Sequence, residues 1–227
     1  MNNRIIILVV FAAMIGVFYS CKKDGEQLAP VTNNLITVVN ASSDTLNIYE
    51  NGTRINSGSN LVPFGQYQNL EITAGAQRYQ FKKAGNVNTL IDLPLSLNDS
   101  SFYSLFVAGE SADNVFLLQD VLFVDTAKGA SNTFIRYVNA SPDAGDIDFT
   151  ISTYPIFKSC AFKSATSFVE VPAGAVFYSM TRQGESAPFA SGNITLSAGV
   201  SYTLFSKGLI KGTGANALGA RILPTVH

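Results

Sequence analysis

The chain repeats itself once, and this repeat constrains its fold more than any other feature. Val39 recurs as Val138, an offset of 99 residues, inside a shared Val-Asn-Ala-Ser motif. Three blocks keep this offset: 39–42 with 138–141, 71–76 with 170–175, and 103–106 with 202–205. A unit of about 100 residues is the size of a whole domain rather than of a solenoid repeat. Each copy is therefore expected to fold around its own hydrophobic core.

The residue pattern inside each copy has a period of two. Short runs rich in Val, Ile, Thr, Tyr and Phe are separated by clusters of Gly, Asn, Asp and Ser, which is typical of strands and turns. Residues 70–72 and 169–171 alternate apolar and charged, and an Ala-Gly turn follows each, as in a hairpin. About seven such runs per copy predict an all-β chain. The expected fold is two tandem Ig-like antiparallel β-sandwich domains, residues 34–125 and 132–227, after a lipoprotein signal peptide.

Several recurring aromatic residues have predicted structural roles. Tyr103 and Tyr202 follow a turn at the start of a strand, which suggests a tyrosine corner whose hydroxyl bonds back to that turn. Two further pairs are expected in the cores of the duplicated domains: Tyr79 with Tyr178, and Phe106 with Phe205.

The N-terminal segment predicts export. Arg4 precedes an apolar run at 5–18, which is too short for the roughly 20 residues of a membrane span but fits the roughly 7–15 of a signal peptide. Residues 18–21, Phe-Tyr-Ser-Cys, resemble a relaxed lipobox of the Bacteroidota type. We therefore expect residues 1–20 to be cleaved, Cys21 to be lipidated, and 21–33 to form a flexible tether. An ordinary secretory signal with an incidental cysteine is the alternative. Two or three acyl chains would hold the protein firmly in the outer membrane.

Composition excludes several classes of function. The chain has 15 basic and 16 acidic residues and no basic stripe, so nucleic-acid binding is disfavoured. Its two cysteines are Cys21 and Cys160, and Cys160 is expected to be a small buried hydrophobe. His227 is the sole histidine, which argues against cysteine-histidine or serine-histidine catalysis. No enzyme activity, metal or cofactor is predicted.

The two copies also carry a family resemblance. The segments VNASSDTLNIYENG at 39–52 and VNASPDAGDIDF at 138–149, each followed by an Ala-Gly turn and a Tyr-x-Leu strand, resemble the tandem domain of unknown function (DUF) 4397 family. The resemblance implies Ig-like or related β-sandwich units in a secreted or cell-surface bacterial protein. The resemblance assigns no catalytic residue to this chain, because the family has no assigned activity.

Carboxylates provide two candidate sites. Asp143, Asp146 and Asp148 cluster in one loop, where oxygen ligands could bind calcium, although short Asp side chains also close turns. Glu71 and Glu170 recur at the same offset. A pair of carboxylates could perform acid-base hydrolysis, but the strand alternation places each on a solvated sheet face.

The remaining candidates concern binding and modification. The chain has no Trp. Phe177, whose partner in the first copy is Arg78, is expected to face outward and is a candidate for ligand contact. Thr45 and Thr126 lie in Asp-Thr-small/apolar contexts that resemble Bacteroidota O-glycosylation sites, a pattern that chance also produces.

Three functions follow from these features. The leading hypothesis is a cell-envelope lipoprotein, facing the periplasm or the outside, that serves as a non-catalytic structural or interaction module for a protein or surface polymer. The second is an accessory glycan-binding lipoprotein for polysaccharide capture. The third is a carboxylate hydrolase, which would need two carboxylates about 5 to 10 Å apart in a cleft.

Overall fold

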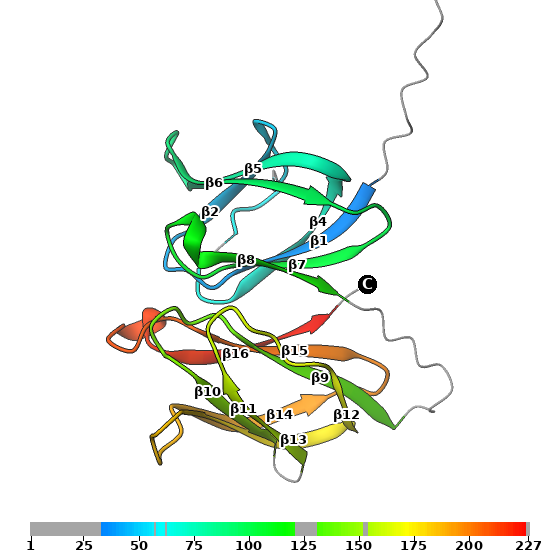
Figure 1. Cartoon of the computed structure of the whole chain (residues 1–227), viewed down its shortest axis with the longest axis vertical. Helices are drawn as coiled ribbons and strands as arrows, with labels where there is room; N and C mark the ends of the chain where they lie inside the picture. The colour runs from blue at the N-terminus through cyan, green and yellow to red at the C-terminus, as the bar shows by residue number, and fades with distance from the viewer. Residues whose placement is uncertain (1–32, 57, 62, 121–130, 152–153, 226–227) are drawn as a thin grey trace, which may run out of the picture. The chain divides into compact units, whose positions relative to one another are not determined.

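The computed structural model describes residues 33–56, 58–61, 63–120, 131–151 and 154–225. All of them belong to one compact unit that begins at Thr32. This part of the chain contains strands β1 to β16 and two short 3-10 turns, η1 (Ala112–Asn114) and η2 (Gly214–Asn216) (Figure 1).

The first copy consists of two four-stranded sheets. Sheet A has the order β4-β1-β7-β8 and sheet B the order β3-β2-β5-β6. The strands of sheet A are β4 (Gln66–Thr73), β1 (Asn33–Asn40), β7 (Phe102–Val107) and β8 (Val115–Asp120). Those of sheet B are β3 (Thr53–Arg54), β2 (Leu46–Glu50), β5 (Gly75–Lys83) and β6 (Thr89–Leu97).

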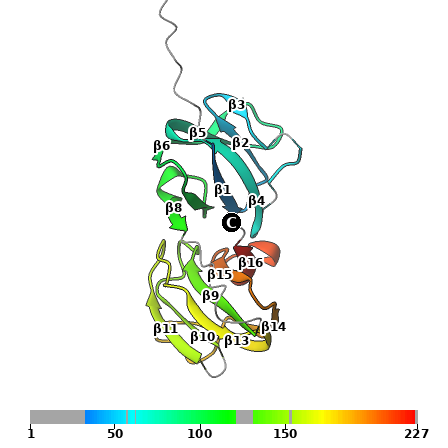
Figure 2. The ribbon, with the colours of Figure 1, turned by 90° about the vertical axis from the view of Figure 1, so that its right-hand side faces the viewer.

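The second copy repeats this arrangement. Sheet C has the order β12-β9-β15-β16, and sheet D has the order β11-β10-β13-β14, of which Figure 2 shows β11, β10 and β13 side by side. The strands of sheet C are β12 (Val169–Pro172), β9 (Asn132–Asn139), β15 (Ser201–Lys207) and β16 (Gly219–Thr225). Those of sheet D are β11 (Tyr154–Cys160), β10 (Ile147–Ile151), β13 (Gly174–Arg182) and β14 (Ala190–Leu196).

The predicted class, all-β tandem sandwiches, is confirmed, with one difference in strand direction. Most neighbouring strands are antiparallel, but β1 pairs with β7 and β9 pairs with β15 in parallel. These pairs lie at the centres of sheets A and C. A parallel pair needs a long crossover connection, and in each copy this connection contains the whole opposite sheet and one edge strand of the same sheet, β4 or β12. The hairpin patterns of the sequence cannot show this long-range pairing.

Each copy has its own core, as expected from its length. The first is built around residues such as Ile48, Tyr79 and Phe81, and the second around Tyr137, Phe149 and Met180. Tyr178, the counterpart of Tyr79, is only half-buried.

The predicted tyrosine corners are confirmed in both copies. The Tyr103 hydroxyl accepts a hydrogen bond from the backbone N–H of Asn98, at 3.0 Å. The Tyr202 hydroxyl accepts one from Ser197, also at 3.0 Å. Each tyrosine thus fixes the turn that precedes its own strand.

A third core joins the two copies. Its buried residues, which we call the seam, come equally from both: Val39, Ala41, Phe106 and Ala108 from the first, and Val138, Ala140, Phe205 and Leu223 from the second. The rings of Phe106 and Phe205 meet edge to face with centroids 5.6 Å apart, a favourable aromatic geometry. The prediction that these two phenylalanines lie in the cores of separate domains was therefore wrong. They pack against each other because sheets A and C are also apolar on their outward faces.

The seam uses the same patch of each copy. Val39 with Val138, Ala41 with Ala140, and Phe106 with Phe205 are all 99 residues apart in the sequence. Such self-complementary packing is the pattern of an isologous homodimer interface, here formed within one chain.

An ion pair is buried beside the seam. The Arg136 guanidinium on β9 lies 2.6 Å from the Asp120 carboxylate on β8, and the side chains are 5% and 1% exposed. Arg136 also donates to the Thr203 hydroxyl at 2.9 Å, while the Ser104 hydroxyl donates to Asp120 at 2.6 Å. These hydrogen bonds offset the cost of removing both charges from water. Strand register identifies the equivalent positions in the other copy. Thr37 of the first copy is equivalent to Arg136, and Thr225 of the second copy is equivalent to Asp120. The first copy therefore supplies the negative charge and the second copy the positive charge.

Gly65 allows a second close approach between the copies. Its φ is +96°, and an added Cβ would lie 2.5 Å from Cγ of Arg221. The Arg221 guanidinium donates to the carbonyl of Phe64 at 3.3 Å. Glycine is thus required here both by backbone conformation and by space.

The buried ion pair generates a stability prediction. Arg136→Met should leave the Asp120 carboxylate buried without its partner and lower the free energy of unfolding by about 3–5 kcal/mol. Adding Asp120→Leu should recover most of this loss, because no isolated charge then remains. Denaturant unfolding of a soluble form beginning at Lys22 would measure both variants.

The exposed Arg78–Asp92 pair supplies the control, since its side chains are 65% and 37% exposed. Arg78→Met should change the free energy of unfolding by less than about 1 kcal/mol. An Arg136→Met variant as mild as Arg78→Met would show that the buried pair does not support the junction.

Candidate interaction site

The outward face of sheet D carries an exposed aromatic side chain. Phe177 on β13 is 46% exposed, while its neighbours Val176 and Tyr178 pack against the core of the second copy. The predicted outward orientation of Phe177 is confirmed. The Phe177 side chain points outward because every second residue of β13 faces away from the core.

Small polar residues surround Phe177 on this face. Asn193 on β14 lies directly opposite it in the strand register. The exposed neighbours on β14 are Ser191, Asn193 and Thr195, and Ala175 and Ser179 flank Phe177 along β13. A ring bordered by hydroxyl and amide groups offers apolar contact area together with hydrogen-bonding groups that cost less to desolvate than charged groups do.

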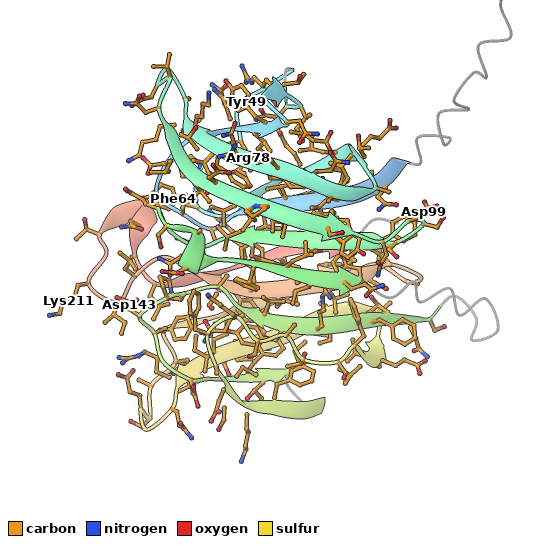
Figure 3. The ribbon with its side chains drawn as sticks, turned by 45° about the horizontal axis from the view of Figure 1, so that its top comes forward. Tyr49, Phe64, Arg78, Asp99, Asp143 and Lys211 are labelled. Carbon is orange, nitrogen blue, oxygen red and sulfur yellow. The ribbon has the colours of Figure 1, made fainter. Side chains whose placement is uncertain are left out.

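The equivalent face of the first copy is different. Arg78, labelled in Figure 3, stands at the position of Phe177 and pairs with Asp92 on β6. The Asp92 carboxylate holds the pKa of Arg78 above its usual value through a hydrogen bond and its charge. Lys82 lies over the ring of Tyr49 on the same sheet, 4.5 Å from its centroid. The first copy thus presents charges where the second presents a phenyl ring.

The three candidate calcium ligands have separate partners. Both carboxylate oxygens of Asp143 accept from the backbone N–H of Ile210, at 3.1 and 3.2 Å, which ties this loop to the loop carrying Lys211 (Figure 3). Asp148 accepts from the N–H of Ser159 at 2.8 Å, and the backbone carbonyl of Asp146 accepts from Gln183. Within the described ranges, no three His, Cys, Asp or Glu side chains are grouped to hold a metal ion. Asp143 and Asp148 thus each accept from the backbone of a distant segment, so they join separate loops and strands rather than close their own turns.

The recurring glutamates have surface positions. Glu71 on β4 is exposed, and Glu170 on β12 is half-buried and accepts from the Asn132 amide at 2.6 Å. A different glutamate, Glu50, makes more hydrogen bonds, and the sequence pattern did not identify it. The Glu50 carboxylate accepts from the Thr73 N–H at 2.9 Å and from the Tyr79 hydroxyl at 3.1 Å. Its counterpart at the end of β10 is Ile151, so the duplicated motif gives no hint of this network.

Modification and anchoring residues are only partly within the described ranges. Thr45 is half-buried, and its carbonyl accepts from the N–H of Ala84. Cys21, the signal segment 1–20 and Thr126 lie outside the described residues. Among the described residues, no helix has the length and apolar character needed to span a membrane.

Cys160 is buried, as predicted. Its side chain packs in the core of the second copy with 7% exposure. Burial, together with the charges of Asp148 and Asp146, raises the pKa of its thiol. The thiolate is therefore scarce at neutral pH, which is the opposite of a catalytic cysteine.

Comparison with known proteins places the chain in a family. The model of the domain of unknown function DUF4397 matches residues 34–150 and 133–219. The chain belongs to the DUF4397 family. No curated protein sequence matches this DUF4397 chain.

Solved structures resemble the DUF4397 chain distantly. A family CBM26 module of Eubacterium rectale Amy13K, crystallised with maltoheptaose, has 11% identity and a TM-score of 0.28, over 86% of this chain and 98% of that one. The streptococcal family 41 carbohydrate-binding modules have 10% identity and a TM-score of 0.25, over 82% and 96%. The Bacillus anthracis TIE protein has 12% identity and a TM-score of 0.21, over 80% of this chain and 34% of TIE. At these values no ligand is transferred to the DUF4397 chain.

The buried thiol gives a direct test of the second core. In the form beginning at Lys22, Cys160 is the sole cysteine. At pH 8 we expect its reaction with iodoacetamide to be at least about tenfold slower in the native protein than in urea, because both access and thiolate fraction are low.

The pH dependence of labelling has a definite sign. Since the pKa is raised, the native labelling rate should still be climbing above about pH 9, where an ordinary thiol is levelling off. Rapid native labelling that plateaus near pH 8 would contradict a buried Cys160.

Proposed function

We propose that the mature protein is a Bacteroidota-type lipoprotein of the cell envelope, anchored in the outer membrane through lipidated Cys21. Its paired sandwiches act as one non-catalytic interaction module. The N-terminal sequence supports the anchor, since 5–18 is an apolar run of signal-peptide length and a small residue, Ser20, precedes the cysteine.

The observation that carries the module hypothesis is the seam between the copies. Tandem domains on a flexible linker move independently unless a substantial apolar interface holds them together. Here buried aromatic and aliphatic side chains from both copies share one core, with the Arg136–Asp120 pair beside it. A unit of this kind can hold a contact face at a fixed orientation relative to the rest of the protein.

The outward face of sheet D is the contact surface we assign to this module. Large exposed hydrophobic side chains in the described residues are Val87, Phe177 and Ile210, and Phe177 is the one within a strand. A flat strand position presents the ring to a partner with little loss of conformational entropy. The partner class is a protein or a surface polymer in the periplasm or outside the cell.

Glycan capture is a second candidate function. The observation that favours it is the ring of small hydroxyl and amide residues around Phe177, because sugars offer apolar faces and many hydroxyl groups. A single aromatic residue without Trp provides limited contact area, so the general interaction module is the stronger candidate.

The anchor is tested by changing the lipidated residue. Cys21→Ala should abolish acylation and signal cleavage by the lipoprotein peptidase, so the protein should keep residues 1–20 and its mass should be that of the full chain without lipid. Mass spectrometry and membrane fractionation of the native host would show this. Ser20→Ala keeps a small residue before the cysteine and should leave acylation unchanged. An unacylated wild-type protein would refute the anchor.

The contact face is tested with intact protein in its native membrane. Phe177→Ala should reduce recovery of a specific partner at least about tenfold, the effect of losing a central interface side chain. Val87→Ala is the matched control, since Val87 is 85% exposed in the first copy. A parallel glycan array distinguishes the two functions: glycan binding lost with Phe177→Ala would favour polysaccharide capture. Binding unaffected by Phe177→Ala would rule out this face.

A further inference from the structure

The second copy contains a cavity between its two sheets. The cavity has a volume of about 260 Å³ and is lined by Tyr178, Ile194, Leu204, Ala220, Arg221 and Ile222. These residues come from β13 and β14 of sheet D and from β15 and β16 of sheet C. Strands β14 and β16 are both edge strands, so the cavity lies where the sandwich is open along its side. Tyr178, Ile194 and Ile222 are half-buried, which leaves the cavity accessible from solvent.

The second copy has smaller residues than the first at three interior positions on the strands that surround the cavity. In the strand register, Ala190 stands at the position of Ile91 and Gly192 at that of Leu93. Ile91 is 1% exposed in the first core, and Leu93 packs against that core. On the opposite sheet, Ala220 replaces Val115. Each replacement removes carbon atoms from the interior of the sandwich, whereas Tyr137 and Phe149, elsewhere in the second core, are larger than their counterparts Val38 and Ile48.

Glycine at 192 serves no conformational need. Its φ lies outside the left-handed region, and an added Cβ would meet Cε1 of Tyr178 at 3.6 Å, an ordinary van der Waals distance. A strand interior normally disfavours glycine. Its effect here is to leave open the space beside the Tyr178 ring.

The Tyr178 hydroxyl has also lost the acceptor that serves its counterpart. In the first copy the Tyr79 hydroxyl bonds to the Glu50 carboxylate at 3.1 Å. Ile151 occupies the position of Glu50 opposite Tyr178. A phenol donor thus borders an otherwise mainly apolar cavity, without the carboxylate that satisfies its equivalent.

We propose that this cavity binds a small uncharged molecule that has one aromatic ring or branched alkyl group and one hydrogen-bond acceptor. The apolar part would lie against Ile194, Leu204 and Ile222, and the acceptor would receive the Tyr178 hydroxyl. An apolar cavity of about 150 Å³ suffices for benzene, so the volume here accommodates a ring with a short substituent. The site is independent of the lipid anchor and of Phe177.

Acetophenone and ethylbenzene are matched probes, because they differ in the presence of a carbonyl acceptor. Methyl NMR of the form beginning at Lys22 should show both probes shifting the resonances of Ile194, Ala220 and Ile222 at saturable concentrations. Acetophenone should bind about 2–10-fold more tightly, the effect of one neutral hydrogen bond. Tyr178→Phe should remove this preference while ethylbenzene still binds.

Filling the cavity with the residue of the first copy is the decisive variant. Gly192→Leu should abolish binding of both probes and leave the midpoint of thermal unfolding unchanged or raised. Ser191→Asp is the control, because it also copies the first copy, but on the outward face of β14. It should bind both probes as the wild type does. Ala220→Val provides a second filling variant from the opposite sheet and should weaken binding at least about tenfold.

Two results would overturn binding in this cavity. One is the absence of saturable shifts at these methyl groups in the wild type. The other is probe binding that survives both Gly192→Leu and Ala220→Val in folded protein. An acetophenone preference that persists in Tyr178→Phe would overturn the role of the hydroxyl.

Discussion

The contact between Arg136 and Asp120 determines how the two copies of this chain combine. Both side chains are nearly inaccessible to water, and each belongs to a different sandwich. A buried ion pair adds little net stability over apolar packing, but an unpaired buried charge costs several kcal/mol. Pairing two first copies through the same patch would place Asp120 opposite Thr37, which has no positive charge. The ion pair therefore favours packing of the first copy against the second copy over packing of two first copies from separate chains.

Duplication followed by divergence explains the other features of the structure. The seam retains equivalent residues from both copies, while the positions around it differ. The first copy has the larger residues Ile91 and Leu93 at the positions of Ala190 and Gly192, together with the Glu50–Tyr79 hydrogen bond and a charged outer sheet. The second has an open cavity beside Tyr178 and an exposed Phe177 on its outer sheet. The proposed ligand cavity and the proposed contact face both lie in the second copy, on sheets C and D.

Much of the fold was predictable because it depends on local patterns that occur twice. Alternation identified the strands, the offset of 99 residues identified two units, and Tyr103 and Tyr202 identified their turns. The seam was missed because alternation does not reveal what covers an outward face. A signal was present: residues 35–39 and 103–107 are largely apolar in both phases, as in strands buried on two sides. The Asp143 and Asp148 contacts and the cavity beside Gly192 depend on cross-strand register, which one sequence does not specify.

The most direct test of the joined pair is the relative alignment of the two sandwiches in solution. Backbone residual dipolar couplings, measured on the form beginning at Lys22, would be fitted separately for residues 33–120 and 131–225. Copies held by the seam and the Arg136–Asp120 pair should give alignment tensors of the same magnitude and orientation. Tensors of clearly different magnitude would show that the sandwiches move independently and would contradict a single interaction module.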